Sequence, residues 1–539
     1  MQNIPIVFIA FQEQDNLGVG YLCSTLVEAG YEVEIIDYRH DKKYILERLQ
    51  FHNPLIIGFS IIFQYHLYDF KQLINFLREN GIKSHFSAGG HYPSLRYKEL
   101  LKKIPQIDSV VRFEGEWAFL ELVNLIYKGK QWKDILNIAY IRDGTIVSNP
   151  IRPLENDLDK FQPPARPPLK EYALNKKYAT LLAGRGCYYN CSFCSIREFY
   201  SEPPGPLKRV RRPEMVAREI ELLHEQLDCA IFMFQDDDFP LAKNKGKDWA
   251  ISFCEQLHKK KLNDKILWKI NCRPDEVDKE TFMLMKNSGL FLVYLGIEAG
   301  TDLGLKRMNK HLTVEKTFQA INILKELEIA FDFGFMLFDP WSTYKSILGN
   351  LTFLEKIIAD GSSPITYCKM LPYAETQVEL QLKNENRLKR IADYEDYDFL
   401  DGSLDNLYTF LVDCFDNWIG QHDGVLNLAR WARYYFLVEQ KYYPMNSNSI
   451  NLDRSILNII SESNKFFIDV VKKMAKYYCL EVNSDSDIDH KRVAKVKEIV
   501  NAKHFEYQSK LNEIIKIIKN SDDKFSFVEE KSSNTFSTV

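Results

Sequence analysis

Three cysteines in the middle of the chain have the types and spacing that most directly predict chemistry. Cys187, Cys191 and Cys194 stand at a C-x3-C-x2-C spacing that follows Gly184-Arg-Gly186. Thiolates at this spacing can bind three irons of a cubane [4Fe–4S] cluster, and the glycines let the backbone bend closely around it. No fourth cysteine lies nearby in the sequence, so one iron would stay open for another ligand. A zinc site with a distant fourth ligand, or three ordinary cysteines, are the alternatives.

An open iron of this kind can chelate the amino and carboxylate groups of S-adenosylmethionine (SAM). An electron that enters the sulfonium then releases a 5′-deoxyadenosyl radical, and the cofactors supply this chemistry. The motif and the downstream segments resemble the radical SAM superfamily over about residues 175–380. In that family the aromatic residue just before the third cysteine packs near the adenine; here it is Phe193. The resemblance makes the three cysteines the metal ligands and the catalytic residues.

Charged residues end three of the strands that we expect after this motif. Asp236, Asp237 and Asp238 form one group, Arg273 a second and Glu298 a third. The resemblance implies that Asp236 or Asp238 meets the amino group of SAM, and that Glu298 binds its ribose hydroxyls or amino group. Arg273 could pair with a carboxylate. Adjacent side chains of a strand face opposite ways, so the three aspartates cannot all point inward. A solvated charge at a loop edge is the alternative for each.

Residues 177–380 alternate between strand and helix patterns, with helical stretches of about ten to sixteen residues between apolar strands. Six βα units predict a partial (β/α)6 barrel of the TIM type, with its chemistry at the carboxyl ends of the strands. The cysteine motif follows the first of them. The predicted strands are Tyr178–Ala183, Ala230–Gln235, Leu267–Asn271, Leu292–Glu298, Phe331–Leu337 and Ile365–Met370.

Residues 1–130 also alternate between strand and helix. Nearly continuous apolar strands predict a parallel sheet that helices cover on both faces. This is a doubly wound, Rossmann-like domain, whose ligand should lie at the carboxyl ends of the strands. The predicted strands are Ile4–Ile9, Glu32–Asp37, Pro54–Ser60, Lys83–Ala88 and Ser109–Phe113, and Gly18–Gly30 is a predicted helix.

This first domain resembles the cobalamin-binding domain that precedes the radical domain in one large branch of the superfamily. The landmarks lie in the first helix and after three strands, where glycines let a bulky planar ligand approach the backbone. The loop Ile61–His66 should lie under the corrin. No D-x-H-x-x-G pattern is present, so the resemblance implies cobalamin without that histidine on cobalt. The implied contacts are Gly18, Ser60, Phe63, Gln64, Gly89, Gly90, His91, Glu114 and Gly115, although His91 could equally be a surface histidine.

The remaining segments differ in character from the two domains. Residues 131–176 contain the proline-dense stretch Phe161–Pro168 and read as a linker, while residues 381–520 read as a helical C-terminal cap. Polar residues 521–539 predict a disordered tail. For two further features the sequence leaves two interpretations open. The basic run Lys208–Arg212 either binds an anion or is a solvated loop, and the aromatic residues of the cap either line a substrate pocket or form core.

Composition narrows the class of protein. The 539 residues carry a formal net charge of −4, which gives no basic excess for nucleic acid. There is no signal-peptide pattern and no apolar run of the length that spans a membrane. The cysteines outside the motif are scattered singly, which favours a reducing compartment. We therefore expect a cytoplasmic protein without a nucleic-acid partner. The resemblance implies a small-molecule substrate and an external electron donor of the flavodoxin or ferredoxin type.

These features together predict a cobalamin-dependent radical SAM enzyme. The leading hypothesis is a methyltransferase that moves a methyl group from methylcobalamin to an unactivated carbon of a small molecule or natural product. An oxidative cyclase or ring-rearranging enzyme without methyl transfer is the alternative. A cobalamin-binding sensor without catalysis is a third hypothesis. A methylthiotransferase acting on transfer RNA would need a second cysteine cluster, and the first domain has only Cys23.

Overall fold

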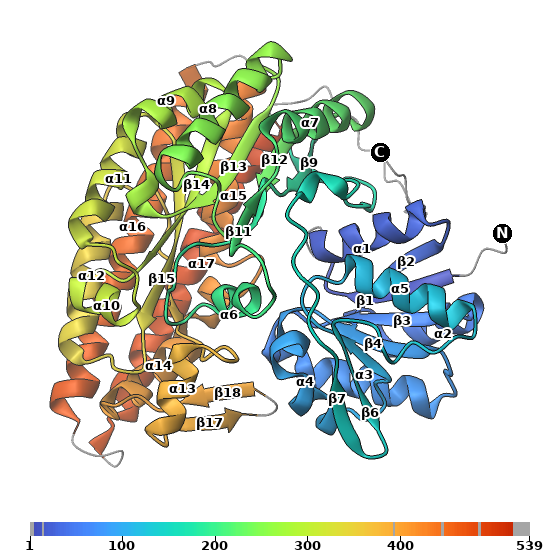
Figure 1. Cartoon of the computed structure of the whole chain (residues 1–539). Coiled ribbons are helices and arrows are strands. Elements are labelled where there is room, and N and C mark those ends of the chain that lie inside the picture. Colours follow the sequence, from blue (N-terminus) through green and yellow to red (C-terminus); the bar gives the residue numbers. More distant parts are fainter. Residues whose placement is uncertain (1–4, 13–15, 392–393, 444–446, 483–486, 521–539) are drawn as a thin grey trace.

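The computed structural model describes residues 5–12, 16–391, 394–443, 447–482 and 487–520. Within them the chain forms two seven-stranded sheets, two short two-stranded sheets and a set of long helices. Figure 1 shows the first sheet and its helices on one side, and the second sheet with the long helices on the other. The predicted tail at 521–539 lies outside the described residues.

The first sheet has the strand order β2-β1-β3-β4-β5-β6-β7. Its first five strands are parallel, as predicted, and helices cover both faces. Apolar residues of α1 and α5 pack on one face, and those of α2, α3 and α4 on the other. The strands are β1 (Pro5–Ala10), β2 (Glu32–Asp37), β3 (Ile56–Ser60), β4 (His85–Gly89) and β5 (Ser109–Val111), and the helices are α1 (Leu17–Glu28), α2 (Lys42–His52), α3 (Leu67–Glu79), α4 (His91–Lys103) and α5 (Glu116–Tyr127).

The segment 131–176 differs from the predicted linker. It contributes β6 (Ile138–Arg142) and β7 (Thr145–Ser148), an antiparallel hairpin that extends the first sheet. Asp143 and Gly144 form its tight turn, and both have positive φ. Asp-Gly is the strongest short hairpin signal, because both central residues of a type I′ turn need positive φ. The prolines mark only the later part of the segment as irregular.

The second sheet is the predicted partial barrel, with the order β16-β15-β14-β13-β12-β9-β8. All neighbouring strands are parallel except β8 and β9. Its strands are β8 (Glu171–Ala173), β9 (Lys176–Leu181), β12 (Cys229–Phe234), β13 (Leu267–Cys272), β14 (Leu290–Glu298), β15 (Ala330–Phe338) and β16 (Cys368–Lys369). Helices α7 (Pro213–Leu227), α8 (Lys243–Lys259), α9 (Lys279–Asn287), α10 (Asp302–Arg307), α11 (Val314–Glu326), α12 (Tyr344–Ile358) and α13 (Gln377–Asn384) connect and cover them.

An insertion between β9 and α7 carries the cysteine motif. It contains the two-stranded sheet of β10 (Gly184–Gly186) and β11 (Lys208–Val210), and the short helix α6 (Ser195–Ser201) between them. Figure 1 shows α6 on the side of the barrel that faces the first domain. The cysteines therefore lie at the carboxyl end of β9, next to the first domain.

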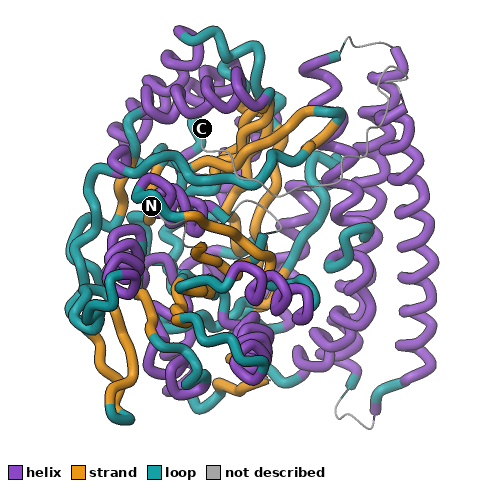
Figure 2. Tube along the Cα trace, turned by 90° about the vertical axis from the view of Figure 1, so that its right-hand side faces the viewer, coloured by secondary structure: helices purple, strands orange, loops and turns teal. Residues whose placement is uncertain are grey.

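The C-terminal region begins with a hairpin that the sequence analysis missed, β17 (Leu388–Ile391) with β18 (Tyr394–Tyr397). Long helices follow, and Figure 2 shows them running side by side. They share one apolar core with the barrel, which includes Phe410, Phe415, Trp418 and Phe436. Among the described residues, no helix is both long and apolar enough to cross a lipid bilayer. The helices are α14 (Ser403–Ile419), α15 (Val425–Tyr442), α16 (Ser447–Lys476) with a π-helical end at Tyr477–Glu481, and α17 (His490–Asn520).

Candidate active site

The cysteine loop is fixed by hydrogen bonds to the barrel. Ser192 donates its backbone N–H to Met308 and its hydroxyl to Arg307, and Asn309 donates its amide to the carbonyl of Asn190. Gly186 has a φ of +82°, and a Cβ there would collide with the carbonyl oxygen of Leu207. Only glycine fits that position, which explains the glycine directly before the first cysteine.

The three thiols lie in a largely buried site with basic neighbours. Burial raises the pKa of Cys187 and that of Cys194 to about 12 each, and also raises the pKa of Cys191. The side chains of Lys310 and Arg273 act on Cys191 in the opposite sense. In the described residues no three His, Cys, Asp or Glu side chains are arranged to hold one metal ion. In a cubane cluster each thiolate binds its own iron, so the three sulfurs need not converge on one point.

The three adjacent aspartates after β12 have different partners. Asp236 accepts hydrogen bonds from the backbone N–H groups of Ala183 (3.0 Å) and Gly184 (2.6 Å). Asp237 accepts from the N–H of Gly186 at 3.0 Å. Both carboxylates therefore hold the backbone that leads into the cysteine loop, which differs from the SAM contact that we predicted for Asp236.

Asp238 is the aspartate with an unused oxygen. It is 3% exposed, and its Oδ2 has no hydrogen-bond partner among the described residues. The Nζ of Lys208 lies 3.8 Å from that oxygen. Burial, together with the Asp238 carboxylate, raises the pKa of Glu276 to about 8, and burial also raises the pKa of Asp238. Asp238 thus keeps a buried carboxyl oxygen without a hydrogen-bond partner beside the thiols.

The remaining predicted charges at strand ends are paired within the protein. Glu298 accepts from the Nζ of Lys310 at 2.9 Å and has a φ of +69°, which is strained backbone for a residue with a side chain. The guanidinium of Arg273 lies 3.7 Å from the centre of the Tyr189 ring and pairs with Asp275 at 2.9 Å. Its Nη1 lies 4.0 Å from the sulfur of Cys191. Arg273 therefore supports the cysteine loop, and its carboxylate partner belongs to the protein.

A cavity of about 600 Å³ lies between the carboxyl edge of the first sheet and the cysteine loop. It lies at the carboxyl ends of the neighbouring strands β1 and β3, the switch point at which doubly wound sheets bind ligands. Its lining combines apolar residues of the first domain with Gly184, Arg185 and Asp237 of the barrel. The predicted residues that line it are Gly18, Ser60, Phe63, Gly89, Gly90, His91, Glu114 and Gly115.

Comparison with known proteins assigns both halves of this site. Residues 6–123 match the B12 binding domain, and residues 181–343 match the radical SAM superfamily. This chain belongs to the cobalamin-dependent radical SAM enzymes. The SAM and cobalamin cofactors and the [4Fe–4S] cluster follow from these two domains.

Individual relatives share the domains but differ in size and named activity. The anaerobic magnesium-protoporphyrin IX monomethyl ester cyclase of Rubrivivax gelatinosus is 31% identical over 59% of this chain, which spans 58% of that protein. The hopanoid C-3 methylase of Methylococcus capsulatus is 23% identical over 62% of this chain and 64% of its own length. The solved structure of the cobalamin-dependent SAM radical enzyme OxsB, at 18% identity, covers 97% of this chain and 81% of OxsB with a TM-score of 0.66. It therefore shares the fold, including the cap.

The cavity fits a flat, bulky cofactor such as cobalamin. Gly58 leaves room where a Cβ would strike the ring of Phe8, and Gly90, at φ +110°, lies where a Cβ would meet the carbonyl of Ile61. At both positions the cavity wall is therefore bare backbone, which a flat ligand can approach closely. His91 is half-buried in the lining, and its Nε2 has no hydrogen-bond partner in the described part of the chain. Burial lowers the pKa of His91 to about 4, so a neutral imidazole faces the cofactor site at neutral pH.

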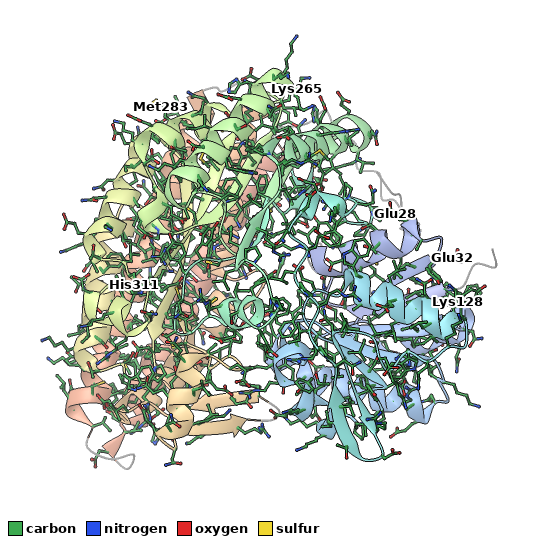
Figure 3. All side chains as sticks on the ribbon, in the orientation of Figure 1. Glu28, Glu32, Lys128, Lys265, Met283 and His311 are labelled. Atoms are coloured by element: carbon green, nitrogen blue, oxygen red, sulfur yellow. The ribbon has the colours of Figure 1, made fainter. Side chains whose placement is uncertain are left out.

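Ion pairs join the cobalamin domain to the radical SAM domain across their interface, which is named the seam. Arg185 pairs with Glu114 at 3.1 Å and with Glu116 at 2.8 Å, and Arg209 pairs with Glu114 at 2.6 Å. Although burial acts to raise it, Arg185 and Arg209 hold the pKa of Glu114 below its ordinary value. Figure 3 shows side chains filling this seam, whereas the labelled Glu32 and Lys128 lie on the outer side of the first domain.

At this seam the structure places two features of the sequence differently from our predictions. Gln64 does not line the cavity, because its carboxamide donates to the carbonyl of Pro372 and accepts from the N–H of Ala374, both at 3.1 Å. It joins the two domains instead of lying under the corrin. The basic run is neither an anion site nor a solvated loop over most of its length, since Lys208, Arg209 and Arg211 are buried and paired with carboxylates.

Proposed function

We propose that this protein is a methyltransferase that uses cobalamin and a radical to methylate an unactivated carbon of a small molecule. The observation that carries the proposal is the shared wall between the two cofactor sites. Asp237 lines the cobalamin cavity and also holds Gly186, the residue directly before Cys187. A corrin in the cavity would thus face the loop that holds the cluster, so both cofactors can reach one substrate.

The residues of the site have separate tasks in this proposal. When bound, the cluster and SAM supply a 5′-deoxyadenosyl radical, and cobalamin supplies a methyl group. Cys187, Cys191 and Cys194 hold the cluster, and Lys310 and Arg273 offset its negative charge. Asp238 offers its free oxygen to the ammonium group of SAM, an ionic hydrogen bond of the stronger class. The paired charges of the seam keep the two domains together while the cofactors react.

The hopanoid C-3 methylase supports this choice, because its name describes methylation of a carbon. A cyclase is the second candidate, because the Rubrivivax protein with higher identity to this chain carries that name. A cyclase needs the radical but does not consume the methyl group of SAM. The two candidates therefore differ in their products.

The test uses protein reconstituted anaerobically with iron, sulfide and cobalamin, given SAM and a reductant such as dithionite. A methyltransferase releases S-adenosylhomocysteine, up to one equivalent per cobalamin without substrate, and also 5′-deoxyadenosine. A cyclase releases 5′-deoxyadenosine and no S-adenosylhomocysteine, and this result would refute the methyltransferase. Cobalamin-free protein is the matched control, which should release no S-adenosylhomocysteine. In the cell an external flavodoxin or ferredoxin would replace dithionite.

A further inference from the structure

Polar residues form a row on the inner face of the barrel sheet, several residues before the carboxyl ends of the strands, where the cysteine loop lies. In the register of the sheet, Asn271 of β13 lies beside Tyr294 of β14, which lies beside Asp332 of β15. Tyr294 is 37% exposed in the middle of a central strand, whereas its neighbours Val293 and Leu295 on the opposite face are fully buried. Since helices cover that opposite face, the exposure of Tyr294 is toward the barrel interior, which is open to solvent at this level.

Two glycines lie between this row and the carboxyl ends of β14 and β15. Gly296 and Gly334 are register partners, two residues beyond Tyr294 and Asp332. A Cβ on Gly334 would lie 2.9 Å from the hydroxyl of Tyr294, and one on Gly296 would lie 2.9 Å from the Nζ of Lys310. The polar ends of Tyr294, Glu298 and Lys310 lie over these two glycines and line a stretch of four residues, or about 13 Å along the strand. An elongated molecule could therefore lie along this wall.

The helical cap contributes a cation to the same row. Arg430 of α15 places its Nε 3.4 Å from the carboxylate of Asp332, and Tyr434, one turn later, donates its hydroxyl to that carboxylate. Among the described residues, the Nε of Arg430 has no hydrogen-bond partner, and Asp332 is the carboxylate that lies within ion-pair distance of the guanidinium. One carboxylate does not use all five N–H donors of a guanidinium, so Arg430 has donors left for a ligand, and its planar fork matches carboxylates and phosphates.

A second cation faces the row from β13. The Nζ of Lys269 lies 5.6 Å from the centre of the Tyr294 ring and donates to the side chain of Asn271. No carboxylate of the described residues lies within ion-pair distance of it. Burial lowers the pKa of Lys269 to about 8, partly offset by Asp332, and such shifted groups concentrate at functional sites. Asp332 lies near both cations, and Asp236 also acts on Lys269, so the two cations and these carboxylates share one site.

We propose that Arg430 and Lys269 form an anion subsite inside the barrel that binds a carboxylate or phosphate group of the substrate. Asp332 and Tyr434 are positioning residues, which orient the guanidinium from behind. The subsite rests on the proposed function, since it holds one end of the substrate while the other end lies near the cluster, about 13 Å away along β14. The substrate is then an elongated small molecule with an acidic group at one end.

The test measures binding of simple probes to protein that carries cluster, cobalamin and SAM. Phenylphosphate and benzoate are the anionic probes, and benzyl alcohol is the neutral one. Calorimetry should show that at least one anion binds, that Arg430→Met and Lys269→Met each weaken it at least tenfold, and that benzyl alcohol binding is the same in all variants. Arg454→Met, an exposed arginine of α16, is the matched control and should bind like wild type. The anion that binds more tightly identifies the acidic group.

Arg430→Lys covers the case in which Arg430→Met does not fold, because it keeps a charge beside Asp332 but removes the fork; it should also weaken the anion. Equal anion affinity in wild type and all three subsite variants would overturn the proposal, as would no anion binding to wild type that still releases 5′-deoxyadenosine. Wild type that binds the anion but releases no 5′-deoxyadenosine would instead refute the proposed function and leave the subsite standing.

Discussion

The cobalamin cavity and the barrel interior are lined in opposite ways. The cavity has glycines and apolar side chains, and its charged residues, such as Glu114 and Arg185, are paired across the seam. The barrel interior keeps polar atoms that have no hydrogen-bond partner in the described part of the chain, such as Oδ2 of Asp238 and Nε of Arg430. The two linings differ because the two proposed ligands differ in size and charge. A large planar cofactor is held by close backbone approach over a wide surface, whereas a small charged ligand needs a complementary charge. Four variants test this contrast.

Arg185→Met should have the largest effect, on stability. It leaves Glu116, which is 5% exposed, without its ion-pair partner and takes one partner from Glu114. Losing one partner of a buried pair costs about 3–5 kcal/mol, read as a lower urea midpoint. Arg212→Met is the matched control, since that side chain is 59% exposed and should cost at most about 1 kcal/mol. Equal midpoints for both variants would show that the seam is not held by these charges.

Gly89→Leu should weaken cobalamin binding without removing the cluster. A Cβ at Gly89 has space, with its nearest contact at 3.4 Å, but a leucine extends into the cavity. A clash of this kind costs about 2–3 kcal/mol, or roughly 30- to 150-fold in affinity, measured by titration of cobalamin absorbance. Gly402→Leu, at an exposed glycine without near neighbours, is the control. Unchanged cobalamin affinity in Gly89→Leu would place the cofactor elsewhere.

Asp238→Asn should weaken SAM binding and leave cobalamin binding intact. The amide cannot form the ionic hydrogen bond to the ammonium group, which is worth about 1.5–3 kcal/mol, or roughly 10- to 150-fold in the Kd of SAM. Calorimetry on cluster-loaded protein measures it, with the exposed Asp248→Asn as the control. A Kd within twofold of wild type would mean that another residue binds the amino group.

Gln64→Ala should have the smallest effect. It tests the contact between the two domains independently of cobalamin binding. It removes two hydrogen bonds between the domains and should lower stability by about 1–3 kcal/mol, again from the urea midpoint. Cobalamin affinity should stay as in wild type, because Gln64 does not line the cavity. Gln162→Ala, which loses one exposed hydrogen bond to Glu28, is the control. A loss of cobalamin affinity as large as that of Gly89→Leu would restore the original corrin assignment of Gln64.

Local sequence signals predicted most of the fold. The apolar strands and their alternation with helices predicted the parallel strands of both sheets to within a few residues, because most of these strands are buried on both faces and read as continuous apolar runs. The β6–β7 hairpin was missed at a boundary, although Asp143-Gly144 carried a usable turn signal. The cap hairpin β17–β18 had no comparable signal, since its short strands are rich in charged residues.

The candidate site was predictable only where its residues follow strand ends. The cysteines, Asp238 and the glycines of the cavity belong to such positions. Lys310 lies after α10 and Arg430 on α15, and only tertiary packing brings them to Glu298 and Asp332. Likewise, which of three adjacent aspartates keeps a free oxygen depends on the backbone N–H groups of a distant loop. Spacing in the sequence carries no information about those contacts.

The most direct test of the central claim is electron paramagnetic resonance on protein that holds both a reduced cluster and cobalt(II) cobalamin. If the cavity faces the cysteine loop, the two unpaired electrons lie close together, and each spectrum should show splitting or broadening that is absent from protein loaded with one cofactor. Cys191→Ala, which lacks a cluster ligand, should give the unsplit cobalt spectrum. A doubly loaded wild-type spectrum equal to the sum of the two single spectra would contradict the account.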